Sequence, residues 1–155
     1  MSKQKSLWRG VLAGIAGGLA AAWMMNEFMQ QAVQSDEENR QQQAHRDEPK
    51  EDATMKAADD IAHTTTGQHL SYPEKEKAGP MVHYAFGALT GGLYGGLAEY
   101  SSVVTSGFGT SFGGILFSSA DFLAVPASAQ ASPFAAHIVY GVTTELVRRI
   151  LRMLL

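Results

Sequence analysis

Residues 7–28 read LWRGVLAGIAGGLAAAWMMNEF, and this stretch decides the fold. After Arg9, no charged residue follows until Glu27. An α-helix rises 1.5 Å per residue, so about 20 apolar residues cross the hydrocarbon core of a bilayer, which is roughly 30 Å thick. The stretch therefore predicts a transmembrane helix.

A cleaved secretory signal is the alternative interpretation of the same stretch. Lys3, Lys5 and Arg9 precede an apolar run that passes through the small residues Ala20–Ala22, as in such signals. The run nevertheless continues through residues 23–25, Trp-Met-Met, beyond any cleavage site. This continuation favours a helix that stays in the membrane.

Charge is distributed very unevenly along the 155 residues. Of the 15 acidic residues, 11 lie between Asp36 and Glu76. With 45% hydrophobic and 17% charged residues the average composition resembles that of a soluble protein, but such segregation is typical of a membrane protein with one long hydrophilic loop. The absence of cysteine excludes a disulfide scaffold and a thiolate metal site. The net charge of −3 argues against a nucleic-acid-binding protein.

Three further apolar stretches follow the first one. We predict an all-α fold in a single domain, residues 1–155: an integral membrane bundle of four transmembrane helices. The predicted spans cover residues 7–28, 80–98, 108–125 and 134–153, with a hydrophilic loop at residues 35–78. Pro80 suits the first turn of the second span, and Pro126 ends the third.

The hydrophilic loop and the chain ends predict an orientation in the lipid bilayer. Basic residues flank the spans at both chain ends, whereas the loop is net negative. Because Lys and Arg stay on the cytoplasmic side, both termini are predicted to be cytoplasmic and the loop to lie outside. Within the loop, Pro49–Ala62 has apolar residues at helical spacing and predicts a short amphipathic helix.

Glycine recurs every fourth residue in three of the predicted spans. Residues four apart share one helix face, and glycine there lets two backbones approach closely. The pattern predicts a tightly packed bundle, which packs within one chain or also against further copies or other membrane subunits. The glycines concerned are Gly10, Gly14, Gly18, Gly87, Gly91, Gly95, Gly109 and Gly113.

Four ionisable residues are predicted to share one depth near the outer surface: Glu27, His83, Asp121 and His137. At 1.5 Å per residue, each histidine lies about 5 Å inside its span end. Such groups usually pair with one another inside a bundle. Three roles remain open: interhelical hydrogen bonds, proton relay or sensing, and binding of a divalent metal. No sequence spacing typical of a metal site is present, and no cofactor is predicted.

A second polar group is predicted at the inner face. Glu145 precedes Arg148 and Arg149 by three and four residues, so ion pairs within one helix are available, and Glu99 at the end of the second span is placed to join them. Aromatic residues near span ends are expected to anchor the bundle at the membrane surfaces. They are Trp8, Trp23, Tyr84, Tyr94, Tyr100 and Tyr140.

The sequence contains no nucleophile elbow, phosphate loop or dinucleotide-binding motif, so we expect no enzymatic activity. The glycine-rich residues 107–114 lack the lysine of a phosphate loop and open an apolar span instead. The predicted role is structural or interactive, as an oligomer or an accessory subunit of a membrane complex. A small proton- or metal-handling membrane protein is the alternative.

Several segments together resemble a known family. They are GPMVHYAFG at residues 79–87, Ala120-Asp121 followed by Val125-Pro126, and HIVYGVTTE at residues 137–145 followed by Arg148-Arg149. This pattern is similar to the small bacterial inner-membrane proteins of the YagU type. The resemblance implies a multi-spanning inner-membrane protein in a family of largely undefined activity, and it supplies no catalytic residues. The glutamine-rich residues 41–43 depart from the pattern.

Overall fold

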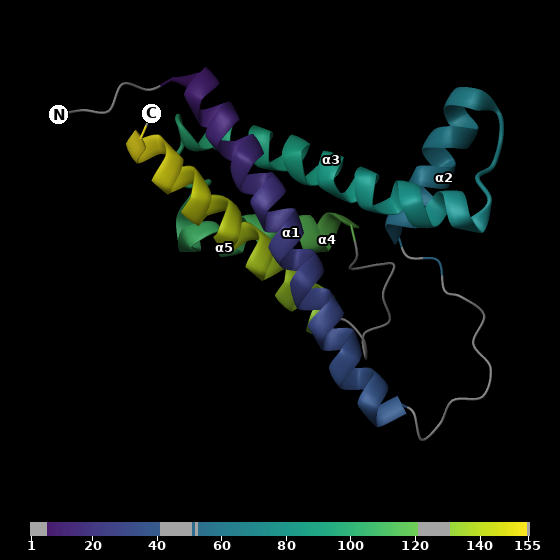
Figure 1. The fold of residues 1–155 in the computed structure, drawn as a ribbon. Coiled ribbons are helices and arrows are strands. Elements are labelled where there is room, and N and C mark those ends of the chain that lie inside the picture. Colours follow the sequence, from purple (N-terminus) through teal and green to yellow (C-terminus); the bar gives the residue numbers. More distant parts are fainter. Residues whose placement is uncertain (1–5, 41–50, 52, 121–130, 155) are drawn as a thin grey trace.

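The computed structural model describes residues 6–40, 51, 53–120 and 131–154, and in this part of the chain the fold is entirely helical (Figure 1). Five α-helices follow one another along the chain, with a short 3₁₀ helix, η1, before the fourth. They are α1 (Leu7–Arg40), α2 (Ala53–Thr66), α3 (Tyr72–Ala98), η1 (Ser106–Gly109), α4 (Thr110–Ala120) and α5 (Ala131–Leu154). The all-α prediction is thus confirmed.

Helix α1 lies at the centre of the bundle, between α3 and α5, while α4 packs against α5 and α2 packs on the start of α3 (Figure 1). Consecutive bundle helices run antiparallel. The start of α1 and the end of α3 therefore meet, and the backbone N–H of Ser6 donates a hydrogen bond to the carboxylate of Glu99 at 3.2 Å. The end of α5 reaches the same place, where Arg152 contacts Glu99.

The contact between α1 and α3 is made by backbone rather than by side chains. A methyl group added at Gly14 would lie 2.1 Å from the carbonyl oxygen of Gly91, and one added at Gly18 would lie 2.0 Å from that of Gly87. Gly10 faces Gly95 in the same way. Two helices this close gain dispersion contacts along their whole backbones, which only glycine at these six positions allows.

Glycine also sets the contacts of α5. A methyl group at Gly17 of α1 would lie 2.7 Å from the carbonyl oxygen of Thr144. Methyl groups at Gly109 and Gly113 would lie 2.1 Å from the carbonyl oxygens of Gly141 and His137, respectively. These contacts pack both α1 and α4 closely against α5.

The start of α3 differs from the predicted span, and the predicted placing of Pro80 in a first turn is wrong. Helix α3 begins at Tyr72, where the carboxylate of Glu74 accepts hydrogen bonds from the backbone N–H of Ser71 at 2.8 Å and from its hydroxyl at 2.5 Å. This capping, with Pro73 in the first turn, starts the helix eight residues earlier and leaves Pro80 inside it.

Helices α1 and α3 extend into the predicted hydrophilic loop, residues 35–78, from its two ends. Helix α1 continues to Arg40, and α2 occupies residues 53–66 rather than 49–62. Residues 41–50 lie outside the described part of the chain, so Pro49 is not placed.

The third predicted span, residues 108–125, also begins differently. Gly107, Phe108 and Gly109 all have positive φ angles, of 63°, 54° and 86°, so regular helix starts only at Thr110. Left-handed backbone cannot continue a right-handed helix, and the two glycines adopt it readily. Residues 121–125 lie outside the described part. The fourth predicted span, residues 134–153, lies within α5.

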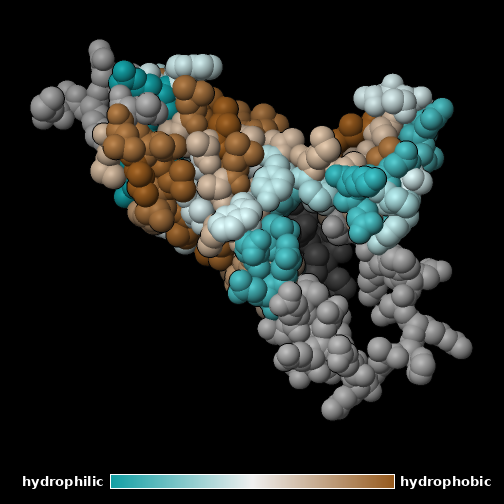
Figure 2. Space-filling view, viewed as in Figure 1, coloured by the Kyte–Doolittle hydropathy of each residue, from teal (hydrophilic) through white to brown (hydrophobic). Residues whose placement is uncertain are grey.

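The bundle interior contains charged and polar side chains beside small apolar ones, and many large apolar side chains are exposed. Glu145 and Thr144 are completely buried, whereas Leu89, Leu93 and Leu97 of α3 are about 60% exposed. Figure 2 shows hydrophobic residues over the end of the molecule that holds the start of α1 and the end of α5, and hydrophilic residues over α2.

Of the described helices, α1 alone is both long enough and apolar enough to cross a membrane, over residues 7–31. Helix α3 is long enough, but its six glycines and its polar residues lower its apolarity, and α5 contains three arginines. The described part of α4 has 11 residues, about 16 Å of helix.

Substituting Gly14 tests the backbone contact between α1 and α3. Gly14→Ala places a methyl group against Gly91 O and is expected to lower the free energy of unfolding by about 3 kcal/mol, because backbone atoms must move apart. Thermal unfolding followed by circular dichroism measures the change. Gly114→Ala is the matched control, since open space surrounds Gly114, and helix propensity should make this variant slightly more stable. Equal effects at both positions would contradict the proposed close contact.

Candidate functional site

The histidines predicted to lie at one depth each bind a backbone carbonyl group. His83 Nε2 donates to Ala22 O of α1 at 3.2 Å, and His137 Nδ1 donates to Pro133 O one turn earlier in α5 at 2.9 Å. Glu27 is partly buried on α1, and Asp121 lies outside the described residues. Within the described part of the chain, no three or more His, Asp or Glu side chains gather as a metal site would require.

The predicted inner-face residues, in contrast, form one connected ionic cluster. Glu145 on α5 is completely buried and accepts hydrogen bonds from Arg148 Nε at 2.7 Å and Arg149 Nε at 2.6 Å. The hydroxyl of Tyr94 on α3 donates to the same carboxylate at 2.9 Å. These contacts fasten α3 to α5 through a group that has no access to water.

Glu99, just after α3, is the second carboxylate of the cluster. Its oxygens accept from Arg152 Nε at 2.6 Å and Nη2 at 2.7 Å, and they lie 3.7 Å from Arg148 Nη1. Arg148 thus lies between the two carboxylates. Among the described residues, three guanidinium groups and two carboxylates thus form one cluster.

Helix periodicity explains how α5 supplies this inner face. Residues at intervals of four lie on one side of a helix, and five such residues of α5 are buried. They are Ala136, Tyr140, Thr144, Arg148 and Arg152. Arg152 was not among the predicted ion-pairing residues, although its position in this series places it there.

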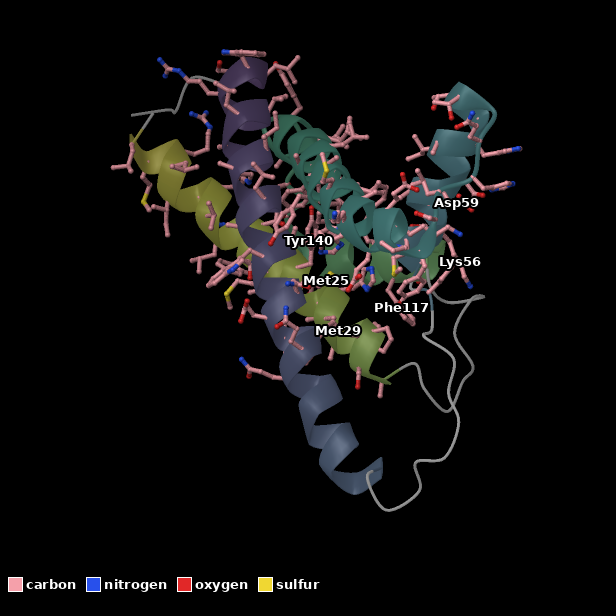
Figure 3. All side chains as sticks on the ribbon, turned by 45° about the vertical axis from the view of Figure 1, so that its right-hand side comes forward. Met25, Met29, Lys56, Asp59, Phe117 and Tyr140 are labelled. Carbon is pink, nitrogen blue, oxygen red and sulfur yellow. The ribbon has the colours of Figure 1, made fainter. Side chains whose placement is uncertain are left out.

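Two of the tyrosines predicted as surface anchors lie instead inside the bundle. Tyr94 is 1% exposed and Tyr140 is 4% exposed. The Tyr140 hydroxyl donates to Gly87 O at 2.7 Å and lies 2.9 Å from the Thr90 hydroxyl, which ties α5 to α3. Figure 3 shows Tyr140 between the helices, close to Met25 of α1. Buried tyrosine needs such a hydrogen-bond partner, and the backbone beside glycine provides one.

Helix α2 docks on α3 away from the bundle, through a charged contact (Figure 3). Met55 and Ala58 are buried, and Met55 packs against Gly79. The carboxylate of Asp59 accepts from the backbone N–H of Leu70 at 2.7 Å and lies 3.1 Å from Lys75 Nζ. The hydrogen bond from Leu70 and the contact with Lys75 lower the pKa of Asp59 to about 2.

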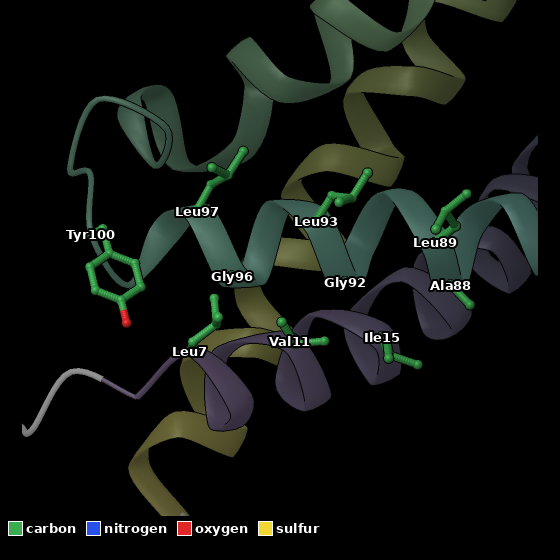
Figure 4. A pocket seen from close by; sticks show the side chains of 10 residues that line it. All are labelled: Leu7, Val11, Ile15, Ala88, Leu89, Gly92, Leu93, Gly96, Leu97 and Tyr100. Atoms are coloured by element: carbon green, nitrogen blue, oxygen red, sulfur yellow. The ribbon is translucent and has the colours of Figure 1, made fainter.

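A groove open to the outside runs between α1 and α3 (Figure 4). Its volume is about 330 Å³, and Gly92 and Gly96 lie along it beside exposed leucines. Ten residues line it: Leu7, Val11, Ile15, Ala88, Leu89, Gly92, Leu93, Gly96, Leu97 and Tyr100. The only polar side-chain atom among them is the Tyr100 hydroxyl, so the groove can hold an apolar chain but supplies no acid, base or nucleophile.

Comparison with known proteins identifies no relative: no protein family, no curated protein and no solved structure matches this chain. The resemblance to proteins of the YagU type therefore stays a prediction.

Removing the buried carboxylate tests what the ionic cluster contributes. Glu145→Gln leaves Arg148 and Arg149 without their buried counter-charge and should lower the free energy of unfolding by about 3–5 kcal/mol. Chemical unfolding of the purified protein measures this change. Glu76→Gln, at an exposed position of α3, should change stability by less than about 0.5 kcal/mol. An unchanged stability of Glu145→Gln would show that the ion pairs only offset their own desolvation.

The contact between α2 and α3 should weaken in acid. Because the pKa of Asp59 in the folded chain, about 2, lies below the ordinary value of 3.8, its ionised form stabilises docking above about pH 4. That stabilisation disappears as the pH falls through about 2. A carboxyl NMR titration should give this midpoint, and Lys75→Gln should raise it. A midpoint near 3.8 in the unaltered chain would contradict the contact.

Proposed function

We propose that the protein is a multi-spanning membrane protein of a bacterial inner membrane with a structural, non-enzymatic role. It acts through helix contacts, as an oligomer or as an accessory subunit of a membrane complex. Helices α1, α3 and α5, together with the predicted span 108–125 that contains α4, provide the traverses, and α2 with the start of α3 forms a hydrophilic hairpin outside the lipid.

The observation that carries this proposal is the exposure of large apolar side chains together with the burial of charged ones. Monomeric soluble proteins rarely expose contiguous apolar patches larger than a few hundred Å². Here large apolar side chains are exposed on every bundle helix, including Leu12, Leu93, Ile115 and Leu146. The ionised Glu145 is buried among its partners. Lipid, unlike water, is the solvent in which this arrangement is favourable.

Helix length and charge support the same proposal. At 1.5 Å per residue, α3 extends about 40 Å and α5 about 36 Å, which suffices for a hydrocarbon core of roughly 30 Å. The charged residues of α5, which are costly to place in lipid, form ion pairs with one another and with Glu99 inside the bundle, near the end of α5. Arg9 lies at that end too, so the positive-inside rule places it in the cytoplasm and the α2–α3 hairpin outside.

The interaction role rests on the outer face of α3. Leu89, Leu93 and Leu97 form an exposed ridge, and the groove beside it has Gly92 and Gly96 along its floor. A ridge next to a glycine-lined groove is the surface that a second transmembrane helix packs against. The ionic cluster around Glu145 and the hydrogen bonds of Tyr140 hold the helices together, and such contacts between helices fit a structural role.

The absence of cysteine from the chain permits a direct experiment. Leu93→Cys should remain in the membrane fraction after an alkaline wash and should form a disulfide-linked or heterobifunctionally cross-linked species larger than one chain. Lys56→Cys, on the exposed side of α2, should not cross-link but should react in intact cells with a maleimide that cannot cross the membrane.

Three results would contradict parts of the proposal. Release of the unaltered protein into the aqueous phase without detergent would exclude membrane integration. Labelling of Lys56→Cys only after permeabilisation would reverse the orientation. A strictly monomeric species on native gels, with no cross-linked product from Leu93→Cys, would exclude the interaction role.

A further inference from the structure

Arg149 differs from the other arginines of the ionic cluster in how it is held. Its side chain is 48% exposed, whereas those of Arg148 and Arg152 are about 10% exposed. Arg149 Nε donates to Glu145 at 2.6 Å, and its guanidinium carbon lies 4.5 Å above the ring centre of Phe108. Its two terminal nitrogens, Nη1 and Nη2, donate to no described residue.

Phe108, whose ring lies beneath Arg149, has an unusual backbone conformation. Phe108 has φ 54° and ψ 44°, a left-handed conformation that is unfavourable for a bulky side chain. Gly109 follows it in tight contact with the backbone of Gly141, which fixes this segment against α5. Strained backbone of this kind persists where packing enforces it and is concentrated at functional sites.

The surroundings of Arg149 combine charge and apolar surface. Arg149 is the exposed arginine of the ionic cluster and therefore the member that an added anion can reach. Leu146 and Ile150, four residues apart on one face of α5, are next to Arg149 along the helix surface and are 46% and 44% exposed. Arg149 is five residues from the last described residue of α5, about 8 Å along the helix.

We propose that Arg149, stacked on Phe108, binds the phosphate group of an anionic phospholipid whose acyl chains cover Leu146 and Ile150. This inference rests on the proposed membrane location. A guanidinium fork matches two phosphate oxygens, and its Nε contact with Glu145 and its aromatic support pre-organise it. Free phosphate offers the same oxygens, but the adjacent apolar side chains favour the lipid. Basic sites at the cytoplasmic ends of transmembrane helices bind such headgroups.

The test is a lipid titration of the purified full chain in detergent, followed by native mass spectrometry. Phosphatidylglycerol and phosphatidylcholine with identical acyl chains are the two probes. The unaltered protein should retain one phosphatidylglycerol molecule more tightly than phosphatidylcholine. Arg149→Gln should weaken phosphatidylglycerol binding about tenfold, as expected for loss of one charge-assisted bidentate contact. Arg149→Lys should recover only part of the affinity, and Phe108→Leu should weaken it while keeping the charge.

Arg9→Gln is the matched control, because Arg9 is exposed at the same end of the bundle without an aromatic support among the described contacts. It should leave the lipid affinity unchanged.

Equal losses in Arg9→Gln and Arg149→Gln, or equal retention of the two lipids, would overturn the proposal. Displacement of the lipid by millimolar inorganic phosphate would overturn the lipid as the source of the anion. If Arg149→Gln does not fold, Phe108→Leu and Arg149→Lys decide the question. Release of the unaltered protein into water would refute the membrane location itself.

Discussion

The direct contact between the backbones of α1 and α3 is the constraint on which the rest of the bundle depends. Gly10, Gly14 and Gly18 face three glycines of α3, with no space for a methyl group at any of them. Because α1 lies between α3 and α5, direct contact between α3 and α5 requires side chains that are long enough to reach past α1. Long hydroxyl-bearing side chains, Tyr94 and Tyr140, bridge that distance.

The charges of the bundle are arranged to limit the cost of burying them. Isolated ions in an apolar interior are very unfavourable, and paired ions are tolerated only when their remaining hydrogen-bonding capacity is satisfied. Glu145 meets this condition through two arginines and a tyrosine, and Glu99 does so through Arg152 and the backbone of Ser6. The two carboxylates therefore connect the start of α1, the end of α3 and the end of α5 in a single place.

Local patterns in the sequence predicted the helical fold and the arginines that pair with Glu145, because both depend on spacing along one helix. The start of α3 was missed because Ser71 and Glu74 lie in a charged segment that resembles loop. The left-handed Phe108 has no local signal beyond its flanking glycines. The inward orientation of Tyr94 and Tyr140 depends on which face of each helix meets its neighbour. The series from Tyr140 through Thr144 and Arg148 to Arg152 was nevertheless visible in the sequence as a polar stripe.

The central position of α1 has a consequence for biogenesis. Helix α1 is made first during synthesis, but Gly14 packs on Gly91 and Gly17 packs on Thr144, residues that emerge from the ribosome much later. Helix α1 can therefore pack on α3 and α5 only after these later helices have been translated. A chain that stops before α5 would leave one side of α1 uncovered, an exposed surface by which quality-control proteases could recognise incomplete products.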